Sequence, residues 1–172
     1  MVRMLGGILI LSGSVGLGMW YRARFIESIQ VKQILVEILE RLMSEVRYGN
    51  TALPECCKRL GEQMEDPYGK GFREIACIYR EAGQVSFAGV FVQVMGQCLA
   101  GLPLKKEERD IFLEAFRQGG FQDKEMQLKC FERSRDRLLT CIRSEEKTLP
   151  GKCRMALSLG GMSGLIMIIV LL

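Results

Sequence analysis

The sequence MLGGILILSGSVGLGMWY at residues 4–21 and the sequence MALSLGGMSGLIMIIVLL at residues 155–172 contain no charged residue. Each stretch has 18 residues. An α-helix rises about 1.5 Å per residue, so each stretch would reach roughly 27 Å, close to the hydrocarbon thickness of a bilayer. Nearly all of the charge lies between the two stretches. The sequence therefore predicts a domain attached to a membrane by a helix at either end.

Basic residues beside the apolar stretches indicate which side of the membrane the middle region occupies, because Lys and Arg close to a span tend to stay in the cytoplasm. Only Arg3 precedes the first stretch. We therefore expect both termini to lie outside the cell membrane. Three parts are predicted: an N-terminal transmembrane helix at 1–21, a cytoplasmic helical bundle at 22–154 and a C-terminal transmembrane helix at 155–172. The basic residues that set this topology include Arg22, Arg24, Lys152 and Arg154.

Each apolar stretch has an alternative interpretation. The first could be a cleaved signal peptide, since Arg3 followed by an apolar run fits that pattern. It ends in Met19, Trp20 and Tyr21, however, which suit an interfacial anchor better than a small-residue cleavage site. The second could be a buried core helix, but it lacks a polar stripe and follows basic residues. Membrane spans are favoured in both cases.

Composition narrows the class of the middle region. The chain has 172 residues and a formal net charge of +4. All 20 acidic residues and every basic residue except Arg3 lie in the middle region, which is therefore close to neutral and unlike a nucleic-acid-binding domain. The seven cysteines form no CxxC pair, and the chain has no histidine. We expect reduced cysteines in a cytoplasmic domain, no metal site and no cofactor.

Apolar residues in the middle region recur at helical spacing. Val31, Leu35, Ile38, Leu42 and Val46 follow one another at three or four residues and define one helix face. The first helix is expected to continue from the first span to about residue 48. Short links imply antiparallel neighbours, so the predicted fold is all-α, an antiparallel bundle of about six helices flanked by two transmembrane helices. The other bundle helices are expected near 52–64, 67–80, 86–98, 105–117 and 123–149, with Pro150-Gly151 separating the last from the second span.

The sequence offers no pattern typical of catalysis. It lacks histidine and the GxSxG and HExxH motifs. Gly69-Lys70-Gly71 shares residues with a phosphate-binding loop but lacks the upstream Gly and the following Ser or Thr. Glu107, Glu108 and Asp110 are interpreted as surface acids that stabilise a helix start. We expect that the protein is not an enzyme.

Small residues recur one helical turn apart within both apolar stretches. Gly160 and Gly164 form a GxxxG pair, and Ser12 and Gly16 have the same spacing. Such pairs allow close helix approach in membranes, which predicts packing between the spans or between subunits, so a homo-oligomer is one expectation. Glycine is also generally more frequent in membrane helices, and both interpretations stay open.

Three groups of residues resemble the stage III sporulation protein AB family of endospore-forming bacteria. They are EVRYGNTAL at 45–53, the segment 116–127 with its Gly119-Gly120 turn, and LSLG at 157–160 with Gly164 entering the last span. Together with the N-terminal span, the resemblance covers the whole chain. Family members often have Thr-Pro-Leu where this chain has TAL at 51–53, and Leu-Gly where it has Gly119-Gly120.

The resemblance implies a fold and a function. The family is similar in fold to the platform proteins of type II secretion and type IV pilus machines, whose cytoplasmic helical bundles work beside a hexameric ATPase. It implies a non-catalytic membrane platform that helps assemble the channel complex between mother cell and forespore, on the mother-cell side. The implied partners are a secretion-type ATPase and other membrane proteins of the channel. The alternative function is a membrane-tethered helical adaptor or scaffold unrelated to sporulation.

The end of the first long helix is the candidate contact with the ATPase. Arg47, Tyr48, Gly49 and Thr51 lie there, at the end of the bundle farthest from the membrane in the predicted fold. An aromatic residue among charges often marks a contact surface. Alternatively, Tyr48 only packs over the turn at Gly49.

Overall fold

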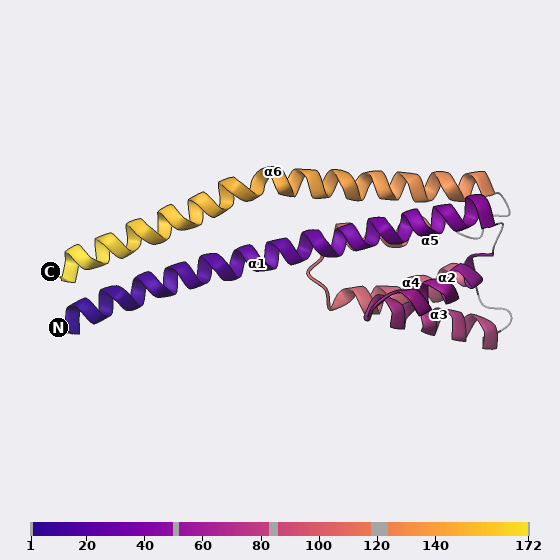
Figure 1. Cartoon of the computed structure of the whole chain (residues 1–172), viewed down its shortest axis with the longest axis horizontal. Coiled ribbons are helices and arrows are strands. Elements are labelled where there is room, and N and C mark those ends of the chain that lie inside the picture. The colour runs from indigo at the N-terminus through magenta and orange to yellow at the C-terminus, as the bar shows by residue number, and fades with distance from the viewer. Residues whose placement is uncertain (1, 50–51, 83–85, 118–123, 172) are drawn as a thin grey trace. The chain divides into compact units, whose positions relative to one another are not determined.

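The computed structural model of the chain describes residues 2–49, 52–82, 86–117 and 124–171 (Figure 1). The side chains of most residues before 23 and of all residues after 148 lie outside this description. Within it, the elements are helical and none is a strand, which confirms the all-α prediction for these residues. In chain order they are α1 (Val2–Ser44), the π-helical turn η1 (Glu45–Gly49), α2 (Leu53–Gln63), α3 (Tyr68–Ala82), α4 (Phe87–Ala100), α5 (Lys106–Arg117) and α6 (Lys124–Leu171).

Packing divides the chain into two compact units. The bundle unit is Gln30–Ile142, and the other unit consists of Met1–Ile29 and Arg143–Leu172. Within the bundle unit, α2 packs against α3, α3 against α4 and α4 against α5, as the short links between them predict. The expected membrane boundaries, after residue 21 and before residue 155, are not the points at which the packing divides. They stay a prediction.

The apolar face predicted for the first helix is buried in the bundle unit. Val31, Leu35, Ile38, Leu42 and Val46 are each at most 6% exposed. Removing such a side chain from water contributes about 1.5–3 kcal/mol, so this face is a large part of what holds α1 in the bundle. The prediction of these core residues is confirmed.

Phenylalanine rings join four helices at the centre of the bundle unit. Phe91 of α4 stacks on Phe116 of α5, with 3.6 Å between ring centroids and 14° between ring planes. Phe72 of α3 lies 6.0 Å from Phe91, and Phe131 of α6 lies 5.2 Å from Phe116. Phe112 of α5 lies beside both rings of the stack. All five rings are fully buried, so a continuous aromatic core runs through α3, α4, α5 and α6.

The two long helices differ from expectation at one point each. The expected break at Pro150-Gly151 is wrong, because α6 runs without interruption from Lys124 to Leu171. A proline inside a helix removes one backbone hydrogen bond and destabilises the helix by about 3 kcal/mol. The stability of the long helical segments on both sides of Pro150 offsets this local penalty. The first helix ends its α-helical geometry at Ser44, and η1 replaces its last expected turn.

The two predicted membrane spans fall within α1 and α6, in segments whose side chains mostly lie outside the description. Over the residues that the structure does describe, no helix has a stretch long and apolar enough to cross a membrane. The structure therefore does not support the flanking transmembrane helices, and the two-span topology stays a prediction.

Candidate functional site

The residues predicted to contact a partner lie where the first helix ends. η1 follows α1 directly, and Arg47, Tyr48 and Gly49 are its last three residues. Thr51 lies outside the described residues. Each hydrogen bond of a π turn spans one residue more than that of an α turn. The side chains at the end of η1 therefore point in other directions than they would in a continued α-helix. The structure thus brings three of the four predicted residues together and does not place the fourth.

Tyr48 is 81% exposed, the largest exposure among the big apolar and aromatic side chains in the described part of the chain. This exposure does not favour the alternative in which the ring packs over the turn at Gly49. Met126, near the start of α6, is 48% exposed. The end of α1 and the start of α6 lie at the same end of the bundle unit (Figure 1), where Lys124 Nζ donates to the Arg47 carbonyl. We call Arg47, Tyr48, Lys124 and Met126 the tip surface.

Two contacts hold η1 to α6. The Arg47 Nη2 atom lies 3.0 Å from Glu132 Oε1, and the Lys124 ammonium donates to the backbone oxygen of Arg47 over 3.2 Å. A cation is favourable at this position because the C-terminal end of a helix carries a partial negative charge and carbonyls without helical partners. Sequence reasoning missed Lys124 and Glu132, which are 77 and 85 residues from Arg47 and show no local signal.

A third contact ties η1 to α2. Arg59 Nη1 lies 3.2 Å from Glu45 Oε2. The turn is therefore held from α2 on one side and from α6 on the other, while the Tyr48 ring extends into solvent. A side chain presented on a braced turn loses little conformational freedom when it binds.

A buried ion pair lies inside the bundle unit. Lys32 Nζ of α1 is 3.0 Å from Glu108 Oε1 of α5, and the two side chains are 0% and 4% exposed. Glu108 Oε2 also accepts the backbone N–H of Lys105 over 3.0 Å, which caps the start of α5. The interpretation of Glu108 as a surface acid is therefore wrong, because α1 covers it and supplies its counter-ion. This carboxylate is engaged on both oxygens, as a structural group is.

Six of the seven cysteines have side chains that the structure describes, all except Cys153. None of the six that the structure describes forms a disulfide. Burial, with a smaller effect of Glu45, raises the pKa of the Cys56 thiol to about 11, and burial also raises that of Cys57. Both thiols are protonated at neutral pH and are poor nucleophiles and ligands in that form. In the described part of the chain, no group of three His, Cys, Asp or Glu residues is arranged to hold a metal ion.

The residues predicted to set topology and to pack the spans are described only in part. The guanidinium carbon of Arg24 lies 5.5 Å from the centre of the Trp20 ring, which is 59% exposed. Gly16 is exposed, and a Cβ placed on it would meet no described atom within 4 Å. The roles proposed for all these residues stay predictions. The side chains that lie outside the description are those of Ser12, Arg22, Lys152, Arg154 and the positions Gly160 and Gly164.

Comparison with known proteins identifies one family. The family model for Stage III sporulation protein AB matches residues 3–172. A solved structure of stage III sporulation protein AB is similar to this chain with a TM-score of 0.64 and 21% sequence identity, over 72% of this chain and 97% of that chain. At this identity the structural likeness shows a shared fold. No curated protein matches the chain.

Proposed function

The chain belongs to the stage III sporulation protein AB family, and from this premise we propose that it is a non-catalytic membrane platform of the channel complex between mother cell and forespore. Two spans at 1–21 and 155–172 hold it in the cell membrane. The bundle lies in the mother-cell cytoplasm, and both termini lie outside. A secretion-type ATPase is its cytoplasmic partner, and other membrane proteins of the channel are its partners in the bilayer.

Three observations support this proposal. The family is a sporulation family and its model covers nearly the whole chain, which favours the platform over an adaptor unrelated to sporulation. The bundle unit is a helical scaffold with a continuous aromatic core, as a rigid platform requires. The apolar stretches at both ends have basic residues on their inner sides, which favours a cytoplasmic bundle.

The exposure of the Tyr48 ring is the main support for the proposed contact with the ATPase. The turn below it is braced by the pairs Arg47–Glu132 and Glu45–Arg59. Tyr is enriched among the residues that dominate binding energy at interfaces, because its ring supplies a large apolar contact area when a partner covers it. We therefore place the ATPase on the tip surface.

Copurification with the ATPase tests this contact. A tagged full-length chain is isolated in detergent from sporulating cells, and the ATPase recovered with it is quantified. The Arg47→Glu, Tyr48→Ala double variant is expected to recover at least about tenfold less ATPase, since removing a dominant aromatic contact costs about 2 kcal/mol or more. Unchanged recovery would contradict the proposed contact.

The chain offers a matched control in α3. Tyr79 and Arg80 are also an adjacent Tyr and Arg, and both are exposed. The Tyr79→Ala, Arg80→Glu variant makes the same chemical changes on another helix, so it is expected to recover the ATPase at the parent level. An equal loss in both variants would mean that the effect is not specific to the tip surface.

The exposed thiol of Cys77 tests the topology separately. Cys77 lies in α3 of the bundle unit and is exposed, so burial cannot hide it from a reagent. A membrane-impermeant maleimide is expected to label Cys77 in permeabilised protoplasts and not in intact ones, as resolved by peptide mass spectrometry. Labelling of Cys77 in intact protoplasts would place the bundle outside the cell and contradict the two-span arrangement.

A further inference from the structure

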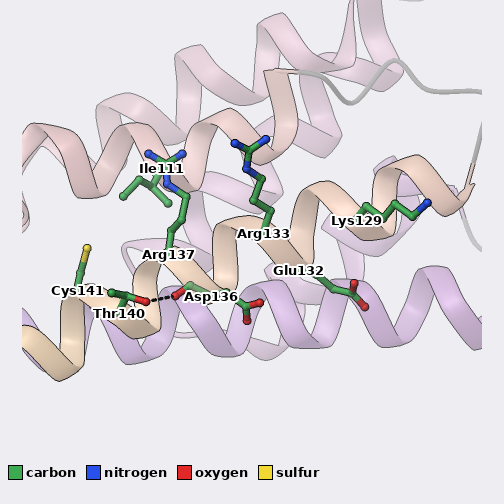
Figure 2. A pocket seen from close by; sticks show the side chains of 8 residues that line it. All are labelled: Ile111, Lys129, Glu132, Arg133, Asp136, Arg137, Thr140 and Cys141. Atoms are coloured by element: carbon green, nitrogen blue, oxygen red, sulfur yellow. Dashed lines mark hydrogen bonds between the residues drawn. The ribbon is translucent and has the colours of Figure 1, made fainter.

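A shallow groove of about 660 Å³ lies along α6 beside α5 in the bundle unit. Figure 2 shows it from close by. Ile111 of α5 contributes a buried apolar side chain, and the rest of the lining comes from α6. We call it the α5–α6 groove and define it by its eight lining residues, which are Ile111, Lys129, Glu132, Arg133, Asp136, Arg137, Thr140 and Cys141.

Three basic residues form a ladder along this groove. Lys129, Arg133 and Arg137 are four residues apart, so they share one face of α6 and extend over about 12 Å. In Figure 2, Arg133 and Arg137 rise from the α6 ribbon on the side where Ile111 lies, whereas Glu132 and Asp136 lie on the other side of the ribbon. The groove therefore presents a row of three cations next to an apolar side chain, and the carboxylates of Glu132 and Asp136 also belong to its lining.

The nearby carboxylates are already engaged with other cations. Glu132 accepts from Arg47 over 3.0 Å, and Asp136 accepts from Arg135 over 2.8 Å. Arg137 is partly neutralised by Glu114 at 2.9 Å.

Lys129 and Arg133 differ from these groups, because neither has a carboxylate partner among the residues that the structure describes. Both side chains are exposed. Two cations in the lining of the groove thus have no carboxylate partner in the described part of the chain.

We propose that the α5–α6 groove binds an acidic helix of a partner protein, in which carboxylates four residues apart meet the ladder Lys129, Arg133 and Arg137. A helix with the same four-residue period reproduces the spacing of the ladder without distortion, and an apolar side chain on the same face reaches Ile111, as in other helix-in-groove complexes. A nucleic acid is the less favoured occupant, because the middle region of the chain is close to neutral, whereas nucleic-acid-binding domains are strongly basic.

A designed peptide tests the groove without knowledge of the natural partner. The probe is a fluorescent 20-residue helix of Ala and Gln with one Leu and with three Glu residues four positions apart. Its binding to the full-length chain in detergent is followed by anisotropy. A second peptide of the same composition has its three Glu residues distributed around the helix. The first peptide is expected to bind at least about fivefold more tightly, because only it can engage all three cations at once.

Substitutions in the groove separate this site from a general charge effect. Lys129→Glu with Arg133→Glu is expected to weaken binding of the first peptide about tenfold or more, since two attractions become two repulsions. Lys129→Arg with Arg133→Lys keeps both charges and is expected to retain binding. The control Lys58→Glu with Lys70→Glu makes the same charge change at exposed residues of α2 and α3 and is expected to bind as the parent does.

Three results would overturn the proposal. One is equal binding of the two peptides, which would reduce the effect to net charge. Another is an equal loss in the groove variant and in the Lys58, Lys70 control. The third is binding of a single-stranded 20-nucleotide oligomer as tight as that of the first peptide, together with a loss of that binding in the same groove variant. This result would mean that the groove binds a nucleic acid. Unchanged helicity of each variant by circular dichroism shows that the comparison is between folded proteins.

Discussion

Lys32 of α1 and Glu108 of α5 form an ion pair with 3.0 Å between Nζ and Oε1, and both side chains are almost wholly buried. Glu108 also accepts the backbone N–H of Lys105, so one carboxylate joins the start of α5 to the first long helix. A slide of α1 along α5 would leave a buried charge alone, which is far more costly than a displaced apolar contact. The pair therefore favours a single register between these helices.

Breaking this pair is expected to be strongly destabilising. Lys32→Met leaves the buried Glu108 carboxylate with only the exposed Lys105 ammonium, 3.7 Å from Oε1, and the expected loss is about 3–5 kcal/mol in the free energy of unfolding. Lys32→Met combined with Glu108→Leu removes both charges and is expected to recover most of that loss, apart from about 1 kcal/mol for the lost cap of α5. Chemical unfolding of the full-length chain in detergent measures both. A double variant as unstable as the single one would contradict this account.

The pair Arg41–Glu37 is the control for that experiment. Its N–O distance is 2.6 Å, shorter than in the buried pair, but both side chains are about half exposed. Water and salt screen such a pair, so Arg41→Met is expected to cost less than about 1 kcal/mol. Burial, and not the distance between the charged atoms, decides the difference.

The aromatic core is expected to be sensitive to a single truncation. Phe116 stacks on Phe91 and also contacts Phe112 and Phe131. Phe116→Ala removes a fully buried ring and leaves a cavity among three helices, so we expect a loss of about 3–5 kcal/mol. Met126→Ala at the exposed start of α6 is expected to stay within about 0.5 kcal/mol of the parent. Thermal unfolding followed by circular dichroism compares the two.

Two glycines are expected to respond in opposite directions to alanine. At Gly61 in α2, a Cβ would lie 2.8 Å from Arg73 Cγ and 2.9 Å from the Arg73 backbone nitrogen of α3. Gly61→Ala therefore forces the two helices apart, at a cost of about 1–3 kcal/mol. At Gly89 in α4 the nearest neighbour is Ser86 Cβ at 3.9 Å, and Gly89→Ala is expected to stabilise the chain by about 0.5–1 kcal/mol. The same sign of change in both variants would contradict the close packing of α2 on α3.

Alkaline pH is expected to destabilise the bundle in part through Cys56. Burial raises the pKa of this thiol from its ordinary value of 9.0 to about 11. The folded state therefore holds the proton more tightly than the unfolded state. The resulting stability is complete below pH 9 and is lost as the pH rises through about 11. Unfolding free energies measured from pH 8 to 11 should fall less steeply in Cys56→Ala, by at most about 1.4 kcal/mol per pH unit. Identical slopes would contradict the buried thiol.

The predictions from sequence were accurate where the signal is local. The face from Val31 to Val46 is buried as predicted, because the positions of apolar residues along a helix follow from its 3.6-residue period alone. Glycine and proline also marked the links between α2, α3, α4 and α5 correctly. The exception is Pro150, which lies inside α6, because a proline disfavours a helix locally but cannot overrule long helical segments on both sides.

The candidate site was predicted only in part for the same reason. Arg47 and Tyr48 were proposed because an aromatic residue among charges at a helix end is visible in the sequence, and their contact with a partner stays a prediction. Their supports Lys124 and Glu132 were not found, since nothing near those residues indicates which helix end they contact. The α5–α6 groove was missed because Ile111 and Arg133 meet only when α5 packs beside α6.

The order of residues alone was enough to establish a helical protein, its buried faces and its family, since helix periodicity and family motifs both lie along the chain. Ion pairs between residues far apart in the sequence could be identified only from the tertiary structure. Lysine is usually exposed to solvent, and Lys32 lies close to the predicted membrane boundary. It is nevertheless buried against Glu108. Whether a charge is solvated or paired depends on the helices that cover it, and that environment exists only after the helices have packed.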